Sequence, residues 1–184
     1  MSSYKIVLIG NTQAGKSTWI EKCTNDELVS EYNQTQEMKC HSLTFSTTEG
    51  QIELNICDCP GIEDEISEEY LSDSDAAIIF CDLTAERGIS YLEYWSYQFK
   101  KICPTKPIVL VGAKVDHLLE MNEDLTDTLT DMHKIGTEIK GGLDLPISYG
   151  LLSIKTDHNV YEPLLQTMKL ITENDQLEFA FPED

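Results

Sequence analysis

Apolar positions along this chain follow two patterns. In several short runs every residue is apolar and many are β-branched, which predicts strands buried on both faces of a sheet. In one run apolar and polar residues alternate, and a turn at residues 48–50 joins it to the next strand, which predicts a hairpin with a half-buried first strand. The predicted strands lie at residues 5–9, 41–47, 51–57, 76–81, 107–112 and 147–152.

Stretches with helical spacing separate these strands. Residues 17–22, 89–101 and 161–174 are predicted to be helical. Residues 120–142 are acidic and only loosely amphipathic, and we expect them to contain an added or extended helix. The polar stretch at residues 25–37 is typical of a mobile loop. Because strands and helices alternate, the pattern predicts an α/β fold with a mostly parallel sheet.

The length and composition favour one globular domain. A chain of 184 residues can bury a sizeable core but leaves little room for a second domain, and 41% of its residues are hydrophobic. Its apolar runs are too short to span a bilayer, and we see no signal peptide or lipidation motif. We therefore expect a soluble protein with no membrane anchor.

The net charge of the chain restricts the kinds of molecule that it is expected to bind. The formal net charge is −20, which argues against nucleic acids and anionic membranes, since both attract basic surfaces. Protein partners are instead expected to present basic surfaces.

The cysteines and histidines suggest no metal site. The six cysteines have no C-x-x-C spacing and most lie in apolar runs, so we expect buried, reduced thiols as in a cytosolic protein. Cys57 and Cys59 flank Asp58, and one of the two could be reactive. The four histidines have no ligand spacing either.

A phosphate-binding motif follows the first predicted strand. Residues 10–17 read Gly-Asn-Thr-Gln-Ala-Gly-Lys-Ser, which matches G-x-x-x-x-G-K-[ST]. Its two glycines let the backbone N–H groups point inward at a helix N-terminus, where they bind anions. Lys16 would reach the β- and γ-phosphates of a nucleotide, and Ser17 would bind magnesium. The residues expected to contact the nucleotide here are Gly10, Asn11, Gln13, Ala14, Gly15, Lys16, Ser17 and Thr18.

A second motif, Asp58-Cys59-Pro60-Gly61, ends the third predicted strand about forty residues after the first. An aspartate at a strand end is placed to hold the magnesium shell, and the Gly61 N–H can donate to a γ-phosphate. The motif is weak evidence alone, but its position after the phosphate loop makes it informative.

Two later segments predict the base site. Residues 113–116 read Ala-Lys-Val-Asp, and the Asp116 carboxylate can accept hydrogen bonds from both N1–H and N2–H of guanine, a pair that adenine lacks. The alternative is that Asp116 is a helix N-cap. A backbone N–H of the triplet Ser153-Ile154-Lys155 could bind guanine O6. Lys114, Asp116, Ser153, Ile154 and Lys155 complete the expected nucleotide contacts.

Together these motifs resemble the small GTPases of the Ras superfamily, and its Ran family most closely. The resemblance covers most of the chain and implies a P-loop GTPase fold: one domain over residues 1–184 with a six-stranded, mostly parallel sheet and helices on both faces. The residues that match Ran are Tyr32, Thr35, His41, Leu43, Phe45, Thr47, Gly50, Asn55, Asp58, 77–79, Trp95, 107–110, 114–116, Pro163 and 177–179.

The resemblance also assigns roles. It implies that Thr35 is the switch I threonine, which binds magnesium and the γ-phosphate only in the GTP state. Lys16, Thr35 and Gly61 are then the candidate catalytic residues. Ser17, Thr35 and Asp58 are the candidate magnesium ligands.

The chain departs from the family at three positions of the site. Ile62 stands where the family has the glutamine that orients the attacking water, which predicts slow GTP hydrolysis unless another group is recruited. Ala113 replaces the asparagine of the N-K-x-D motif, which should weaken nucleotide binding by about 1–3 kcal/mol. Leu28 replaces the aromatic residue that packs on the base in Ran, which should cost about 1 kcal/mol more. The acidic residues 63–65 could substitute for the glutamine or form a solvated helix start.

Two differences in length argue against a nuclear-transport role. The segment after Asp116 is longer than in Ran by about a dozen residues, an insertion within 117–145. The chain also stops just after residues 177–179, so we expect that the C-terminal arm and acidic tail of Ran are missing.

The sequence leaves two functional hypotheses open. The first is a monomeric switch that binds GTP and GDP with Mg²⁺, hydrolyses GTP slowly and cycles with an exchange factor, a GAP and effectors, in the cytoplasm or also in the nucleus. The second is a pseudo-GTPase that binds nucleotide weakly or constitutively and acts as a scaffold. A P-loop kinase is disfavoured by Asp116, and by Arg87 being the only arginine where such a kinase needs several.

Overall fold

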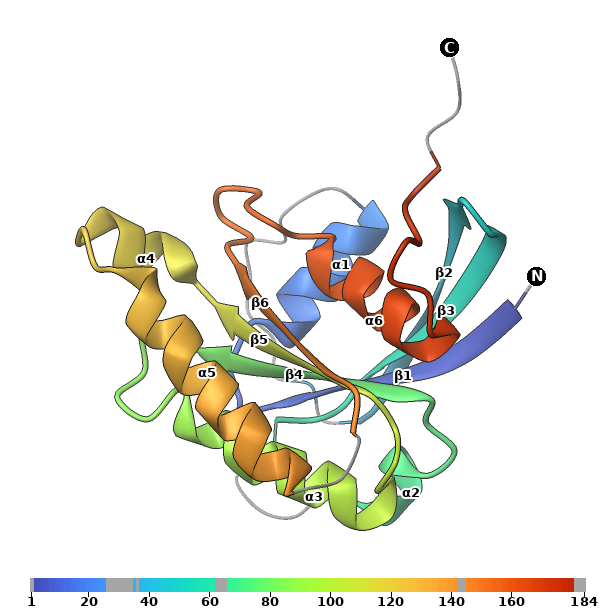
Figure 1. The fold of residues 1–184 in the computed structure, drawn as a ribbon, viewed down its shortest axis with the longest axis horizontal. Coiled ribbons are helices and arrows are strands. Elements are labelled where there is room, and N and C mark those ends of the chain that lie inside the picture. Colours follow the sequence, from blue (N-terminus) through green and yellow to red (C-terminus); the bar gives the residue numbers. More distant parts are fainter. Residues whose placement is uncertain (1, 26–34, 36, 62–65, 142–144, 181–184) are drawn as a thin grey trace.

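A six-stranded sheet runs through the centre of the molecule, with strand order β2-β3-β1-β4-β5-β6 (Figure 1). The hairpin β2–β3 is antiparallel, and every other pair of neighbouring strands is parallel. This confirms the predicted α/β class and the mostly parallel sheet. The strands are β1 (Ser2–Gly10), β2 (Lys39–Thr47), β3 (Gly50–Asp58), β4 (Ala76–Asp82), β5 (Ile108–Ala113) and β6 (Ile147–Leu152).

This computed structural model describes residues 2–25, 35, 37–61, 66–141 and 145–180. Most of the loop predicted at residues 25–37 lies outside this range. So do Leu28, Ile62 and the acidic residues 63–65, and no structural statement is made about them.

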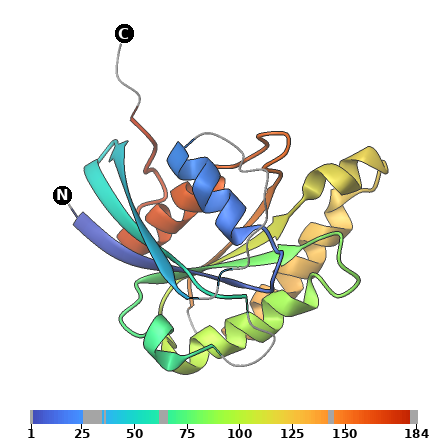
Figure 2. The same ribbon diagram turned by 180° about the vertical axis from the view of Figure 1, so that it is seen from behind.

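Helices cover both faces of the sheet, as expected (Figures 1 and 2). Successive side chains of β1 point to opposite faces. Ile6 and Leu8 pack in one core with Trp19 of α1 and with α6, and Val7 and Ile9 pack in the other core with α2, α3 and α5. The helices are α1 (Lys16–Asn25), α2 (Glu68–Leu71), α3 (Ser90–Ile102), α4 (Val115–Glu120), α5 (Leu125–Lys140) and α6 (Glu162–Thr172). None in the described part of the chain is long and apolar enough to cross a membrane.

The acidic stretch after Asp116 contains α4 and α5, so the expectation of a helix there is confirmed. Asp124 caps the N-terminus of α5 by accepting a hydrogen bond from the Thr126 amide at 2.9 Å. One face of α5 buries Met132, Ile135 and Ile139 against the core that includes α3. A helix with a polar exposed side and a buried apolar stripe explains why the sequence there is acidic and still folds.

The cysteines do not all behave as expected. The register of the β2–β3 hairpin places Cys40 directly opposite Cys57, and the two form a disulfide. The expectation of reduced thiols throughout is therefore wrong for this pair, because their proximity depends on strand register rather than on sequence spacing. The other four cysteines are free. Burial, reinforced by the charge of Asp58, raises the pKa of Cys59 to about 12, so its thiol is protonated and unreactive at neutral pH.

The disulfide should make a measurable contribution to stability. It closes a segment with a sequence separation of 17 residues. Loop-closure entropy then predicts that reduction lowers the free energy of unfolding by about 3 kcal/mol. Urea unfolding with and without a thiol reductant measures this change, and a Cys40→Ser variant should not respond to the reductant.

A count of accessible thiols in the denatured, unreduced protein tests the same pairing. Four thiols are expected, from Cys23, Cys59, Cys81 and Cys103. Six thiols would show that Cys40 and Cys57 are not bonded.

Candidate functional site

The predicted site residues gather at the edge of the sheet where the parallel strands end. In folds of this class, ligands bind at the carboxyl ends of the strands. Two cavities of about 320 and 370 Å³ lie there. We call the first, lined by residues 12–18, Thr35, Gly61 and Lys114, the phosphate cavity. The second, lined by Gly15, Thr18, Ala113, Lys114, Asp116, His117, Ile154 and Lys155, is the base cavity. They share Gly15, Thr18 and Lys114, so they adjoin.

The backbone of residues 10–17 adopts the loop that the motif predicts. Gly10 and Gly15 both have positive φ angles, 146° and 96°. A Cβ at Gly10 would lie 2.3 Å from the carbonyl oxygen of Phe80, so the loop can begin against β4 only with glycine. The Asn11 Oδ1 accepts a hydrogen bond from the Trp95 indole at 2.6 Å. Gly10 and Asn11 therefore contact β4 and α3 and are not among the residues that line the phosphate cavity.

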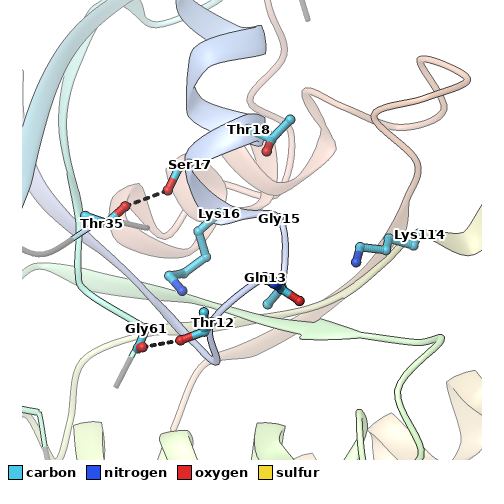
Figure 3. A pocket seen from close by; sticks show the side chains of 10 residues that line it. Thr12, Gln13, Gly15, Lys16, Ser17, Thr18, Thr35, Gly61 and Lys114 are labelled. Atoms are coloured by element: carbon cyan, nitrogen blue, oxygen red, sulfur yellow. Dashed lines mark hydrogen bonds between the residues drawn. The ribbon is translucent and has the colours of Figure 1, made fainter. Parts of the chain in front are cut away.

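Lys16 lies buried inside this loop (Figure 3). Its ammonium donates to the carbonyl oxygens of Gly10 at 2.7 Å and Asn11 at 3.0 Å. Burial lowers the pKa of Lys16 to about 8, although the nearby Asp58 carboxylate acts in the opposite direction. A buried cation whose hydrogen bonds in the described part of the chain go to neutral carbonyl oxygens gains strongly from an anion in the phosphate cavity.

Ser17, Thr35 and Asp58 converge beside Lys16, as the sequence predicts. One oxygen of Asp58 accepts hydrogen bonds from the hydroxyls of Ser17 at 2.6 Å and Thr35 at 3.3 Å. Figure 3 shows the contact between the two hydroxyls, which lie 2.9 Å apart. The other oxygen, Asp58 Oδ1, is buried and has no hydrogen-bond partner in the described part of the chain. An orphaned carboxylate oxygen beside two hydroxyls fits a magnesium ion, which prefers oxygen ligands.

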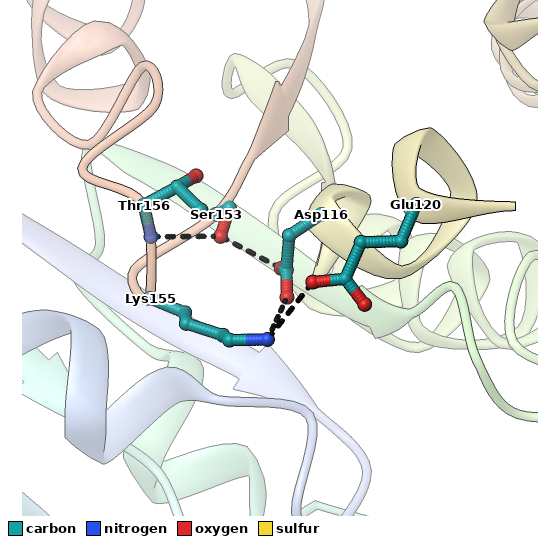
Figure 4. Close-up of polar contacts among 5 residues, drawn as sticks. All are labelled: Asp116, Glu120, Ser153, Lys155 and Thr156. Carbon is teal, nitrogen blue, oxygen red and sulfur yellow. Dashed lines mark hydrogen bonds and ion pairs between the residues drawn. The ribbon is translucent and has the colours of Figure 1, made fainter. Parts of the chain in front are cut away.

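Asp116 lies at the back of the base cavity. Its Oδ1 accepts a hydrogen bond from the Ser153 hydroxyl at 2.7 Å, and its Oδ2 lies 3.6 Å from the Lys155 ammonium, which also pairs with Glu120 at 3.1 Å (Figure 4). Burial favours a higher pKa for Asp116, but the Ser153 bond and the Lys155 charge outweigh it and hold the pKa below its usual value. The alternative role as a helix N-cap is wrong, because Lys114 occupies that position of α4.

Lys114 and the triplet at residues 153–155 frame the base cavity. Lys114 Nζ pairs with Asp82 Oδ2 at 2.6 Å, which fixes its side chain between the two cavities. The Ser153 amide already donates to the carbonyl oxygen of His158 at 3.0 Å. Within this triplet, a backbone N–H that binds a base oxygen must therefore come from Ile154 or Lys155.

Sequence reasoning missed four residues that shape the site. Thr12 was inside the motif, but its hydroxyl was given no role, and it bonds the carbonyl oxygen of Gly61. Asp82 and Trp95 act on Lys114 and Asn11 across long sequence separations, so no local signal marks them. His117 lines the base cavity. Its position directly after Asp116 was the one available signal.

The sequence matches a known family over the part of the chain that holds most of this site. The match is to the family described as "Ras of Complex, Roc, domain of DAPkinase" and covers residues 5–116. It includes the phosphate loop, Asp58, Gly61 and Asp116, and spans more than half of the chain.

The pKa of Lys16 makes phosphate binding dependent on pH. With a value of about 8, the side chain is mostly charged at pH 7 and mostly neutral at pH 9, so its attraction for phosphate is lost as the pH rises through 8. We expect the affinity for a nucleoside diphosphate to fall about tenfold between pH 7 and 9. Calorimetric titration at several pH values measures the change. A Lys16→Met variant should bind more weakly at pH 7 and show no such dependence, whereas an equal slope in both proteins would contradict the role of Lys16.

Proposed function

Because the chain belongs to the Roc family of Ras-like GTPase domains, we propose that it is a guanine-nucleotide switch that binds GTP and GDP with Mg²⁺ and hydrolyses GTP slowly. The observation that carries the proposal is the convergence of Ser17 and Thr35 on Asp58, whose Oδ1 has no hydrogen-bond partner among the described residues. Hydroxyl ligands beside one carboxylate are suited to an ion shared with phosphate oxygens. They are poorly suited to an ion held by protein alone.

In the phosphate half of the site, separate groups are proposed to bind the phosphates and the magnesium ion. Lys16 offers a buried cation to the β- and γ-phosphates, and the loop amides bind the remaining oxygens. Ser17, Thr35 and Asp58 would hold the magnesium ion. When bound, the ion neutralises charge on the phosphate oxygens as the γ-phosphoryl group leaves. Thr35 comes from the segment before β2, so its contact ties that segment to the nucleotide state.

The residues of the base cavity favour the binding of guanine over adenine. Asp116 is charged at neutral pH and fixed by Ser153, so its carboxylate is oriented before the base arrives. Guanine would offer its two N–H donors to the remaining acceptor positions of the carboxylate, and adenine has no such pair of donors. Ala113 presents only a methyl group to the base cavity, and Leu28 lacks an aromatic ring. We therefore propose an affinity for nucleotide below that of family members with asparagine and an aromatic residue at these positions.

The rate of hydrolysis is proposed to be low because Ile62 cannot orient a water molecule by hydrogen bonding. A cycle of this kind needs help, so we propose an exchange factor, a GAP and effectors whose basic surfaces complement the net charge of −20. We also propose that the protein is a monomer and that it acts in the cytoplasm or also in the nucleus. The closer likeness to the Ran family and the insertion within 117–145 stay predictions from the sequence.

A pseudo-GTPase scaffold is the second candidate, and the apolar Ile62 and Ala113 favour it. Against it stands the complete set of Lys16, Ser17, Thr35 and Asp58, which a scaffold does not need. The two hypotheses differ in one respect: only a switch changes the surroundings of Thr35 between its GDP and GTP forms.

Nucleotide content and single-turnover hydrolysis test the proposal. We expect the purified protein to carry guanine nucleotide, and loaded GTP to be hydrolysed slowly. An Ile62→Gln variant should hydrolyse GTP about ten- to a hundredfold faster, because a positioned amide can orient the water, and Ile62→Leu should match the unsubstituted chain. A folded protein that neither carries nor binds guanine nucleotide would contradict the proposal.

Asp116 determines the base preference in this account. An Asp116→Asn variant should bind GDP about ten- to a hundredfold more weakly, because the amide cannot accept two hydrogen bonds from guanine. Its N–H can instead donate to the C2 carbonyl of xanthine, so xanthosine diphosphate should now bind better than GDP. Competition titrations measure both affinities, with the exposed Glu123→Gln as the control. Equal losses for both nucleotides would indicate damage to the fold rather than a change of specificity.

A further inference from the structure

Gly61 lies closer to the phosphate loop than any other residue type permits. A Cβ at this position would lie 2.5 Å from the Thr12 nitrogen and 2.7 Å from the Thr12 Cα. Both neighbours are backbone atoms, which cannot give way as the end of a flexible side chain can. Gly61 is buried by this contact. The segment that starts at Gly61 therefore begins packed against the loop that binds the phosphates.

A side-chain bond holds the two segments together. The Thr12 hydroxyl donates to the carbonyl oxygen of Gly61, across 49 residues of sequence, and both residues line the phosphate cavity (Figure 3). The loop side of this bond is itself anchored, because the neighbouring Asn11 is held by Trp95 at 2.6 Å. The bond thus ties Gly61 to a part of the loop that is fixed by α3.

We propose that Thr12 is a positioning residue that latches Gly61 onto the phosphate loop in the absence of a γ-phosphate, so that nucleotide state is communicated mainly through Thr35. The inference rests on the proposed function for its meaning, but the latch joins two protein groups and needs no ligand. In a switch without it, Gly61 is drawn to the loop only by the γ-phosphate that its N–H binds. In this protein the Thr12 hydroxyl holds Gly61 at the loop instead.

Thr35 is placed differently. Its hydroxyl contacts Ser17 and Asp58, the residues expected to hold the magnesium ion, and these contacts involve the metal site rather than the Thr12 bond. A ligand that rearranges this site changes the partners of Thr35 while Gly61 stays latched. The two contacts involve different atoms, so a ligand can break the Thr35 contact and leave the Gly61 contact intact.

The Gly61 amide can be observed by itself. Pro60 is the one proline in the sequence that precedes a glycine, so ¹³C-carbonyl proline with ¹⁵N-glycine labelling marks the Gly61 N–H alone. The Thr12 bond engages the Gly61 carbonyl oxygen and not its N–H, so the exchange rate of this amide with solvent reports how often the buried contact opens. The rate is measured in the full chain without nucleotide, with GDP, and with a non-hydrolysable GTP analogue, for the unsubstituted protein, Thr12→Val and the hydroxyl-retaining control Thr12→Ser.

The unsubstituted protein and Thr12→Ser should exchange slowly, and at similar rates, in all three states. Thr12→Val should exchange about fivefold faster without nucleotide and with GDP, which corresponds to one lost hydrogen bond, and should return to the slow rate with the GTP analogue. Equal rates for Thr12→Val and the unsubstituted protein in the GDP state would overturn the latch. So would fast exchange in Thr12→Ser.

Failure of the proposed function is distinguishable from failure of the latch. If no guanine nucleotide binds any of the three proteins, the switch hypothesis fails, and the nucleotide-free rates still decide whether Thr12 holds Gly61. Thermal unfolding identifies a variant that does not fold. Thr12→Ala then replaces Thr12→Val as the hydroxyl-free protein, with the same expected increase in exchange.

Discussion

The buried carboxylate of Asp58 is the constraint on which the site depends. One of its oxygens accepts hydrogen bonds from the hydroxyls of Ser17, at the start of α1, and Thr35, which precedes β2. Its other oxygen has no hydrogen-bond partner in the part of the chain that the structure describes. An unpaired, buried carboxylate oxygen is costly in a folded protein, and a bound cation would remove that cost. The same arrangement that is costly without a ligand thus links ligand binding to the position of Thr35.

The remaining elements of the site serve to hold this centre next to a base cavity. Lys16 is buried near Asp58 and lines the phosphate cavity, so a buried cation lies close to a buried anion. Lys114 lies between the phosphate and base cavities and is fixed by Asp82. Asp116 is fixed by Ser153 at the far end. Each charged group is oriented before a nucleotide arrives, which lowers the reorganisation needed on binding.

The sequence was most informative where function depends on short, continuous spacing. The phosphate loop, Asp58 with Gly61 and Asp116 were predicted because each lies directly after an apolar strand, and the parallel sheet brings those strand ends to one edge. The Cys40–Cys57 disulfide, the Asp82–Lys114 pair and the Trp95–Asn11 bond were not predicted. Each joins residues from different elements, and its geometry follows from strand register and helix packing that no local pattern encodes. The same is true of the bond from Thr12 to Gly61.

The most direct measurement of the central claim is the affinity for GDP with Mg²⁺ and with a chelator, in the unsubstituted protein and in Asp58→Ala. If Asp58 helps to hold a magnesium ion between the protein and the phosphates, Mg²⁺ should tighten GDP binding by about tenfold or more in the unsubstituted protein and have little effect in the variant. Equal affinity with and without Mg²⁺ in the unsubstituted protein would contradict the account.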